Sequence, residues 1–121
     1  MSPQPTAYQR SAVLTASQGQ LIVMLYDGAF RFLSQASHAM SERQFELAHK
    51  KLRRAEMIIS HLQASLDFEN GGEIATRLYA IYVFCLRHLN QARSHADPEK
   101  IDEVRGLLKT LRDAWAQVAQ S

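Results

Sequence analysis

The placement of glycine and proline constrains the fold of this chain more than any other feature of its sequence. Beyond the first few residues, the strong helix-breaking sites are the double glycine at Gly71 and Gly72 and the Asp97-Pro98 step. The stretches between them are rich in alanine, leucine, glutamine and arginine, which favour helices. No stretch alternates polar and apolar residues over the length of a strand. The sequence therefore predicts an all-α protein.

Four segments have helical periodicity, and their expected ranges are 18–40, 42–66, 72–94 and 97 onwards. Ser17 with Gln20, and Ser41 with Gln44, have the spacing of a capping box, so we expect them to begin the first two helices. Asp97 is expected to cap the fourth helix, because its carboxylate can accept hydrogen bonds from the first free backbone N–H groups.

The connections between these segments are short, which favours antiparallel neighbours in space. With 121 residues, of which 46% are hydrophobic, the chain is long enough to bury one core without disulfides or metal ions. We therefore predict an antiparallel four-helix bundle domain over residues 17–121. Residues 1–16 are expected to form a mobile N-terminal arm, in which 8–14 can add a short helix.

The first and third helices carry more apolar surface than a bundle core needs. Residues 21–26 and 78–86 are unbroken apolar runs, which cover the whole circumference of a helix. Either these helices are central and wrapped by the others, or part of this surface forms an exposed groove for a partner's amphipathic segment, which we favour. Gly28 costs its helix about 1 kcal/mol relative to alanine, which suggests close helix packing or partner approach there.

Charge and hydropathy argue against several function classes. The net charge of +2 is too small for a nucleic-acid-binding protein, and Glu46 and Glu56 flank the basic residues at 50–54, which we interpret as a solvated helix face. No stretch approaches the roughly 20 apolar residues that span a bilayer, and residues 1–20 lack the apolar core of a signal peptide. The single cysteine, Cys85, fits a reducing compartment. The expected location is the cytoplasm, without membrane insertion.

The titratable residues give little support for catalysis. A di-iron bundle needs two Glu-x-x-His pairs, and this chain has one, Glu46 with His49. One cysteine and no close histidine pair leave no ligand set for zinc. A phosphorelay bundle needs one exposed histidine, for which His49 is the candidate, and this is the less favoured alternative. We expect no metal, no cofactor, no small-molecule substrate and no catalysis.

Several short motifs follow one another along the chain. They are Tyr-Gln at 8–9, LIVMLYDGA at 21–29, AEMII at 55–59, GEIA at 72–75, and the leucines and tryptophan of 107–115. In this order they resemble the FliS family of flagellar secretion chaperones, nearly from end to end. The chain departs from the common pattern of that family at Gln18-Gly19, Phe84 and Arg93.

The resemblance implies a protein that binds the C-terminal segment of flagellin, which is disordered in the free monomer, in apolar grooves. Binding would prevent premature polymerisation in the cytoplasm and help to deliver flagellin to the flagellar type III export apparatus, a component of which is a second expected partner. The N-terminal arm can cover part of the same surface in the free chaperone. A helical adaptor for another secreted flagellar or regulatory protein is the alternative.

The expected groove residues come from the first three helices. They are Leu21, Leu25, Tyr26, Ile58, Leu62, Ile74, Leu78, Tyr79 and Tyr82, with Tyr8 as the arm residue. Where apolar residues are continuous, the sequence does not assign the rotational phase of a helix, so we expect some of these side chains to belong to the core.

Overall fold

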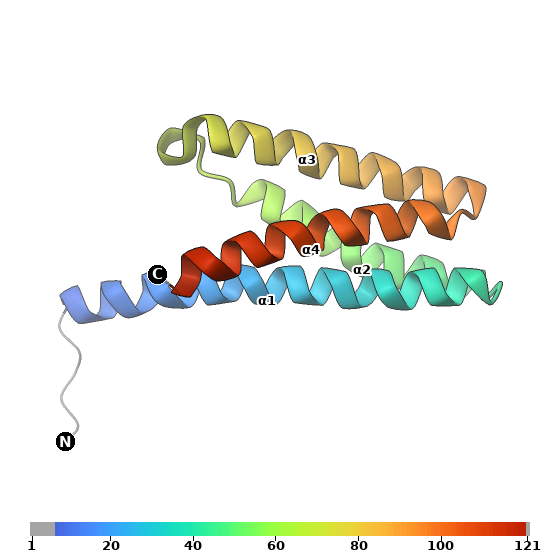
Figure 1. Ribbon diagram of the computed structural model, residues 1–121, viewed down its shortest axis with the longest axis horizontal. Coiled ribbons are helices and arrows are strands. Elements are labelled where there is room, and N and C mark those ends of the chain that lie inside the picture. The colour runs from blue at the N-terminus through green and yellow to red at the C-terminus, as the bar shows by residue number, and fades with distance from the viewer. Residues whose placement is uncertain (1–6, 121) are drawn as a thin grey trace, which may run out of the picture.

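The computed structural model describes the backbone of residues 7–120 and the side chains of residues 18–118. Within residues 7–120 the chain forms four helices: α1 (Ala7–Ser41), α2 (Phe45–Ala64), α3 (Phe68–His95) and α4 (Pro98–Gln120). In Figure 1, α1 and α3 run in one direction and α2 and α4 in the other. The predicted antiparallel four-helix bundle is therefore confirmed.

The helices occupy the corners of the bundle in sequence order. The backbone of α1 packs against α2 and α4, and the backbone of α3 packs against the same two helices from the opposite side. In Figure 1, α3 lies at the top and α1 at the bottom, with α2 and α4 between them. α1 and α3 are therefore diagonal neighbours that can meet only through long side chains.

The first two helix starts differ from the expected ones. α1 begins at Ala7, so the expected start at Ser17 is wrong, because no glycine or proline lies between Ala7 and Ser17 to interrupt the helix. Ser41 is not a cap either, since its hydroxyl donates to the Ser37 carbonyl at 2.9 Å in the last turn of α1. Gln44 is the N-cap residue of α2, without a side-chain capping bond. Capping-box spacing alone was not a sufficient signal.

The N-terminal arm predicted over 1–16 falls only partly on the described residues. Residues 1–6 lie outside them, and residues 8–14, which could add a short helix, are helical and continuous with the rest of α1. The side chain of Tyr8 lies outside the described residues as well. The division of the chain into an arm and a bundle domain over 17–121 stays a prediction.

The fourth helix starts as predicted, whereas α3 begins at Phe68, before the expected start at 72, with Asp67 as its N-cap. The Asp67 side chain accepts hydrogen bonds from the backbone of Glu69 and Asn70, both at 3.1 Å, and the Asn70 N–H lowers the pKa of that carboxyl. The predicted break occurs at Gly72, whose φ of 51° favours glycine, and the helix resumes after this kink. Asp97 caps α4 as predicted, accepting from the backbone N–H of Glu99 at 3.0 Å.

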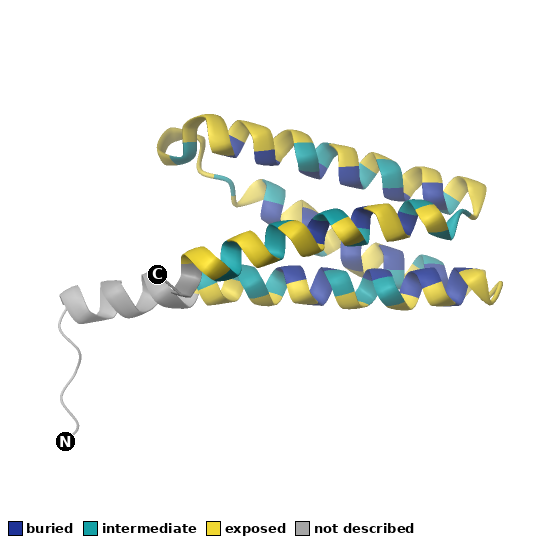
Figure 2. Ribbon diagram, viewed as in Figure 1, coloured by how far each residue is buried: buried dark blue, intermediate teal, exposed yellow. Residues whose placement is uncertain are grey.

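The core runs along the inward sides of all four helices, as Figure 2 shows. Its largest fully buried aliphatic side chains are Leu33, Leu52, Ile59, Leu89, Ile101 and Leu108.

The surplus apolar surface expected from the runs at 21–26 and 78–86 is confirmed. Leu21 and Met24 of α1, and Tyr79 and Phe84 of α3, are exposed. In the part of the chain that the structure describes, no helix has the length and hydropathy to cross a membrane.

Candidate partner-binding site

Two apolar hollows lie at the end of the bundle where α3 begins and α4 ends, and we call them the open-end hollows. The first, of about 250 Å³, is lined by residues of all four helices and of the α2–α3 connection, among them Ile22, Leu62, Leu66 and Tyr82. The second, of about 400 Å³, lies between α3 and α4 and includes Leu111 and Val118. Three further residues line both hollows: Ile74, Leu78 and Trp115.

The local sequence explains why the hollows form at this end. The helix resumes after the kink at Gly72, so Ile74 and Leu78, four residues apart, lie on one face of α3. Leu111 and Trp115 have the same spacing on α4. Because α3 and α4 are antiparallel, the first turns of one helix lie beside the last turns of the other. Two apolar stripes therefore face each other, and Ile74 keeps 69% of its surface exposed.

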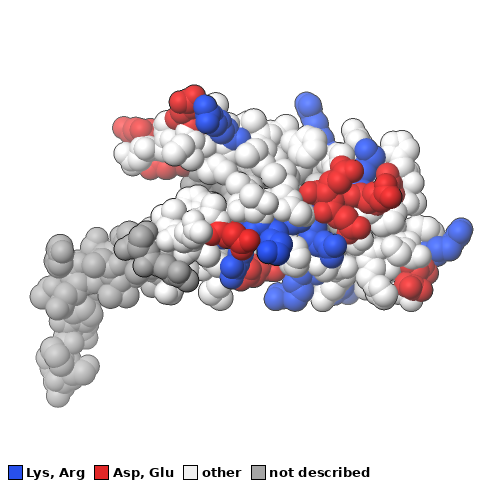
Figure 3. Space-filling view, in the orientation of Figure 1, with Lys and Arg blue, Asp and Glu red and all other residues white. Residues whose placement is uncertain are grey.

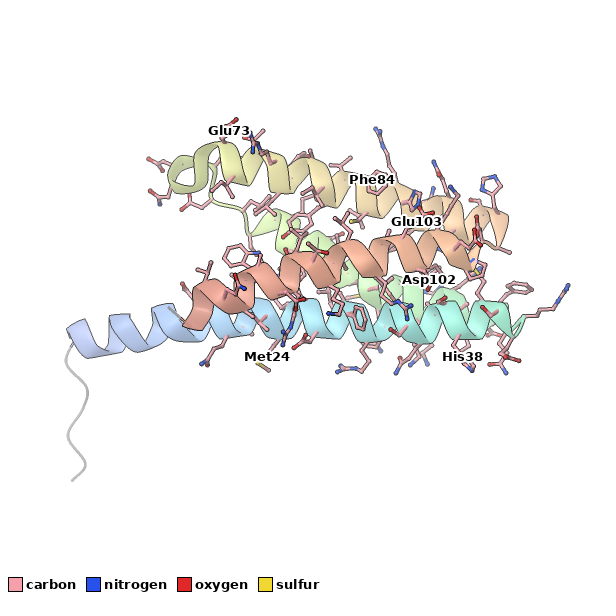
Figure 4. The ribbon with its side chains drawn as sticks, in the orientation of Figure 1. Met24, His38, Glu73, Phe84, Asp102 and Glu103 are labelled. Carbon is pink, nitrogen blue, oxygen red and sulfur yellow. The ribbon has the colours of Figure 1, made fainter. Side chains whose placement is uncertain are left out.

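Polar contacts fasten α3 to its neighbours only in its C-terminal half, as far as the described side chains show. His88 stacks on Phe84, with 4.8 Å between ring centroids, and pairs with Glu103 of α4. Figure 4 shows Phe84 and Glu103 on the same side of the molecule. Arg93 pairs with Glu56 of α2. The N-terminal half of α3 is held to the bundle by apolar packing, and one buried hydroxyl contact lies at the middle of the helix, at Tyr82.

That contact is a polar junction beneath the first hollow. The hydroxyls of Tyr26 and Tyr82 are hydrogen-bonded to each other, and the side chain of Trp115 is hydrogen-bonded to Tyr26. Because an indole N–H can only donate, the Tyr26 oxygen is the acceptor of that bond. Burial raises the pKa of both tyrosines and raises the pKa of the neighbouring Cys85 thiol to about 12. The junction keeps these groups neutral and ties three helices together.

Charges near the hollows are paired along the α1–α4 edge. Arg112 Nε donates to Asp27 Oδ1 at 2.8 Å, and this bond raises the pKa of the guanidinium. Lys109 Nζ lies 3.3 Å from Asp113 Oδ2 and forms an ion pair with it. Figure 3 shows basic and acidic side chains in adjacent groups on this face, so neither sign dominates it. The open-end hollows are therefore suited to apolar side chains rather than to a charged ligand.

The predicted groove residues fall into three groups. Those that line the first hollow are Leu62, Ile74, Leu78 and Tyr82. Tyr26 is fully buried beneath it and supports its floor. The others line neither hollow: Leu21 and Tyr79 are exposed, whereas Leu25 and Ile58 pack partly buried against the core. Whether a partner contacts any of these side chains stays a prediction.

Sequence reasoning missed the α4 side of the site. Leu111, Trp115 and Val118 form the last part of the apolar stripe of α4, and none of them is among the expected groove residues. A usable signal was present, because antiparallel pairing brings the end of the fourth helix beside the start of the third. Applying that rule to Trp115 would have placed it opposite Ile74.

No candidate metal centre accompanies the hollows in the part of the chain that the structure describes. Within it, no group of three or more His, Cys, Asp or Glu side chains could hold a metal ion. Glu46 is exposed and His49 is half-buried on α2. In Figure 4, His38 and Met24 point away from the bundle on the outer side of α1.

The comparisons with known proteins agree with one another. The family model of the flagellar protein FliS matches residues 1–121. A flagellar secretion chaperone FliS of Salmonella typhimurium is 42% identical over 110 residues, which are 90% of this chain and 82% of that protein. Its counterpart in Bacillus subtilis is 35% identical over 116 residues, or 96% and 86% of the two chains. The chain therefore belongs to the FliS family of flagellar secretion chaperones.

Proposed function

We propose that the chain binds the C-terminal segment of flagellin in the open-end hollows and prevents its premature polymerisation in the cytoplasm. It then presents this cargo to a component of the flagellar export apparatus, and it catalyses no reaction. The observation that carries the proposal is the pair of hollows that share Ile74, Leu78 and Trp115. The relatives named flagellar secretion chaperones support an export substrate as the class of partner.

The shape of the site suits short amphipathic helices. Apolar stripes on α3 and α4 form the two walls, and the walls are fastened by polar contacts only toward the other end of α3. An amphipathic helix can lay its apolar face between such walls, with side chains at i, i+3 and i+7 as anchors. The exposed Ile74 is then the wall residue with most surface to bury.

The energetics of such binding are favourable without any charged contact. Ordering a disordered segment costs about 2–5 kcal/mol. Each leucine-sized side chain that is fully buried contributes about 2 kcal/mol. Three or four such anchors in the open-end hollows therefore offset the ordering cost and leave a net gain.

The first test is calorimetric titration of the chain with a peptide of the C-terminal flagellin segment from the same organism. We expect one-to-one binding with a negative heat-capacity change and added helical circular dichroism. Trp115 is the only tryptophan of the chain, so with a tryptophan-free peptide its fluorescence reports on the hollows directly. Absence of both heat and fluorescence change would contradict the proposal and favour an adaptor for another secreted protein.

The second test places the site. Ile74→Asp is expected to lower peptide affinity at least tenfold, because an aspartate in an apolar contact must be desolvated. Since Ile74 is exposed, this variant keeps its helicity, whereas Leu78→Asp would disturb the core. Met24→Asp is the matched control, since Met24 is 66% exposed but lies on the outer side of α1. Equal affinities of the two variants would contradict the assignment of the hollows.

A further inference from the structure

The outer face of α2 carries a group of cations without acidic partners. Lys50, Arg53 and Arg54 are exposed, and among the described side chains none of them forms an ion pair. Glu56, which the sequence places beside them, is instead directed to Arg93 of α3 and forms an ion pair there. The segment is exposed, as expected for a solvated helix face, but Glu56 does not balance the charge of these cations.

Apolar side chains are interleaved with these cations. Leu47 and Met57 are exposed on the same helix, ten residues apart. Residues 47, 50, 54, 57 and 61 follow steps of three and four, so they lie on one face of α2. This is the face opposite Leu52 and Ile59, which are buried in the core. Both apolar and cationic groups are thus presented outward without any opening of the bundle.

Two shallow hollows along this face share one residue. The first, of about 540 Å³, is lined by Gln44, Phe45, Glu46, Leu47, Lys50 and Arg53. The second, of about 550 Å³, is lined by Arg53, Glu56, Met57, Ser60 and His61. Because Arg53 belongs to both, the hollows form one trough, which we call the α2 trough. From Phe45 to His61 it spans about 24 Å, the length of a helix of four to five turns.

We propose that the α2 trough binds an acidic amphipathic helix of a protein partner. Carboxylates of such a helix pair with Lys50, Arg53 and Arg54, while its apolar side chains contact Leu47 and Met57. The positive charge of the trough favours a partner with negative charge, and the apolar contacts favour a peptide helix over a nucleic acid. Leu62, which lines the first open-end hollow, lies on the other face of α2, so this second surface is separate from the proposed cargo site.

A labelled helical peptide of about sixteen residues, matched to the length of the trough, serves as the probe. It carries leucines at i, i+3 and i+7 and glutamates on both flanks of that stripe, and a second peptide has glutamine in place of every glutamate. We expect saturable binding of the acidic peptide by fluorescence anisotropy. Binding should weaken with added salt, because the screening length falls from about 10 Å at 0.1 M to about 3 Å at 1 M.

Paired variants of the full chain assign the site. Arg53→Ala with Arg54→Ala should lower affinity about fivefold to tenfold, since two exposed ion pairs are lost. Arg77→Ala with Arg87→Ala changes the net charge equally on α3 and should change affinity less than about twofold. Met57→Gln should weaken binding, whereas Met24→Gln, at 66% exposure against 67% for Met57, should not.

Three results would overturn the proposal. The first is an equal effect of the α2 and α3 arginine pairs, which would indicate net charge alone. The second is binding of the glutamine peptide as tightly as the glutamate peptide. The third is binding of a DNA duplex or of anionic phospholipid vesicles through Arg53 and Arg54 without binding of the peptide, which would assign the face to polyanions in general. Chemical-shift changes confined to residues 45–61 of α2 would support the peptide assignment.

Discussion

The hydroxyls of Tyr26 and Tyr82 are hydrogen-bonded to each other in the core, so α1 and α3 are joined although they lie at diagonal corners of the bundle. Trp115 of α4 adds a second hydrogen bond to Tyr26. Tyr82 and Trp115 also line the first open-end hollow. The same side chains therefore hold the bundle together and shape its proposed binding surface.

Tyr26 is expected to matter more for stability than Tyr82. Tyr82→Phe removes one partner of Tyr26 but leaves it the Trp115 contact, and should cost about 1 kcal/mol. Tyr26→Phe leaves the Tyr82 hydroxyl and the Trp115 indole without partners, and should cost about 2–3 kcal/mol. Urea unfolding of both variants measures this difference. Equal free energies of unfolding would contradict the central position of Tyr26 in the junction.

Alkaline pH is expected to unfold the chain. Burial raises the folded-state pKa of Tyr26 and Tyr82, and that of Cys85 to about 12. These groups are neutral when protonated, so their contribution is complete below the unfolded pKa values, about 8.5 for cysteine and 10 for tyrosine. It is lost as pH rises above them. Tyrosinate absorbance should therefore appear together with loss of helical circular dichroism. Complete ionisation of the tyrosines in a fully helical chain would contradict this.

Replacing Gly28 by alanine is expected to stabilise the bundle. A Cβ atom at Gly28 would lie 3.4 Å from Ile58 Cδ1, an ordinary van der Waals distance. The gain in helix propensity is up to about 1 kcal/mol. Gly106→Ala on α4 is the matched control, because a Cβ there meets nothing within 4 Å. Thermal unfolding compares the two. A loss of stability in Gly28→Ala alone would indicate that α1 and α2 need closer packing at this point.

The ion pair between Arg93 and Glu56 is expected to contribute more than an exposed one. Only 24% and 23% of these side chains are exposed, against 74% and 79% for Arg77 and Glu73, so solvent screens the α2–α3 pair less. A double-mutant cycle should give a coupling free energy of about 1 kcal/mol for the first pair and about 0.3 kcal/mol for the second. Equal coupling energies would show that burial of the first pair adds nothing.

The number and direction of the helices could be predicted because their strongest signals are local. Asp97 before Pro98 caps a helix in almost any context, and Gly72 takes a φ that other residues avoid. The capping-box spacing at Ser17 and at Ser41 was weaker evidence. A serine with glutamine three residues later starts a helix only where the preceding residues are not already helical. Here α1 is already helical before Ser17 and extends to Ser41.

The site was harder to predict because it depends on rotational phase. In an unbroken apolar run, sequence spacing treats Tyr26 and Leu21 alike, yet one is fully buried and the other is exposed. Ion pairing posed the same difficulty. Glu56 lies near Arg53 in sequence, and only the packing of α3 against α2 shows that Glu56 forms its ion pair with Arg93. The rotational phase of a helix and the ion-pair partner of a charge both depend on where a second helix lies. The periodicity of one helix does not give that position.

The ion pairs of α3 with its neighbours lie only toward its C-terminal end, so the helix can tilt about that end. From His88, where α3 is held to α4, the fourteen residues back to Ile74 extend about 21 Å along the helix axis. A tilt of about 5° around that point moves the Ile74 end by about 2 Å, by the same helix geometry. The width of the open-end hollows can therefore change by about the radius of a methyl group while every ion pair of α3 with its neighbours stays closed.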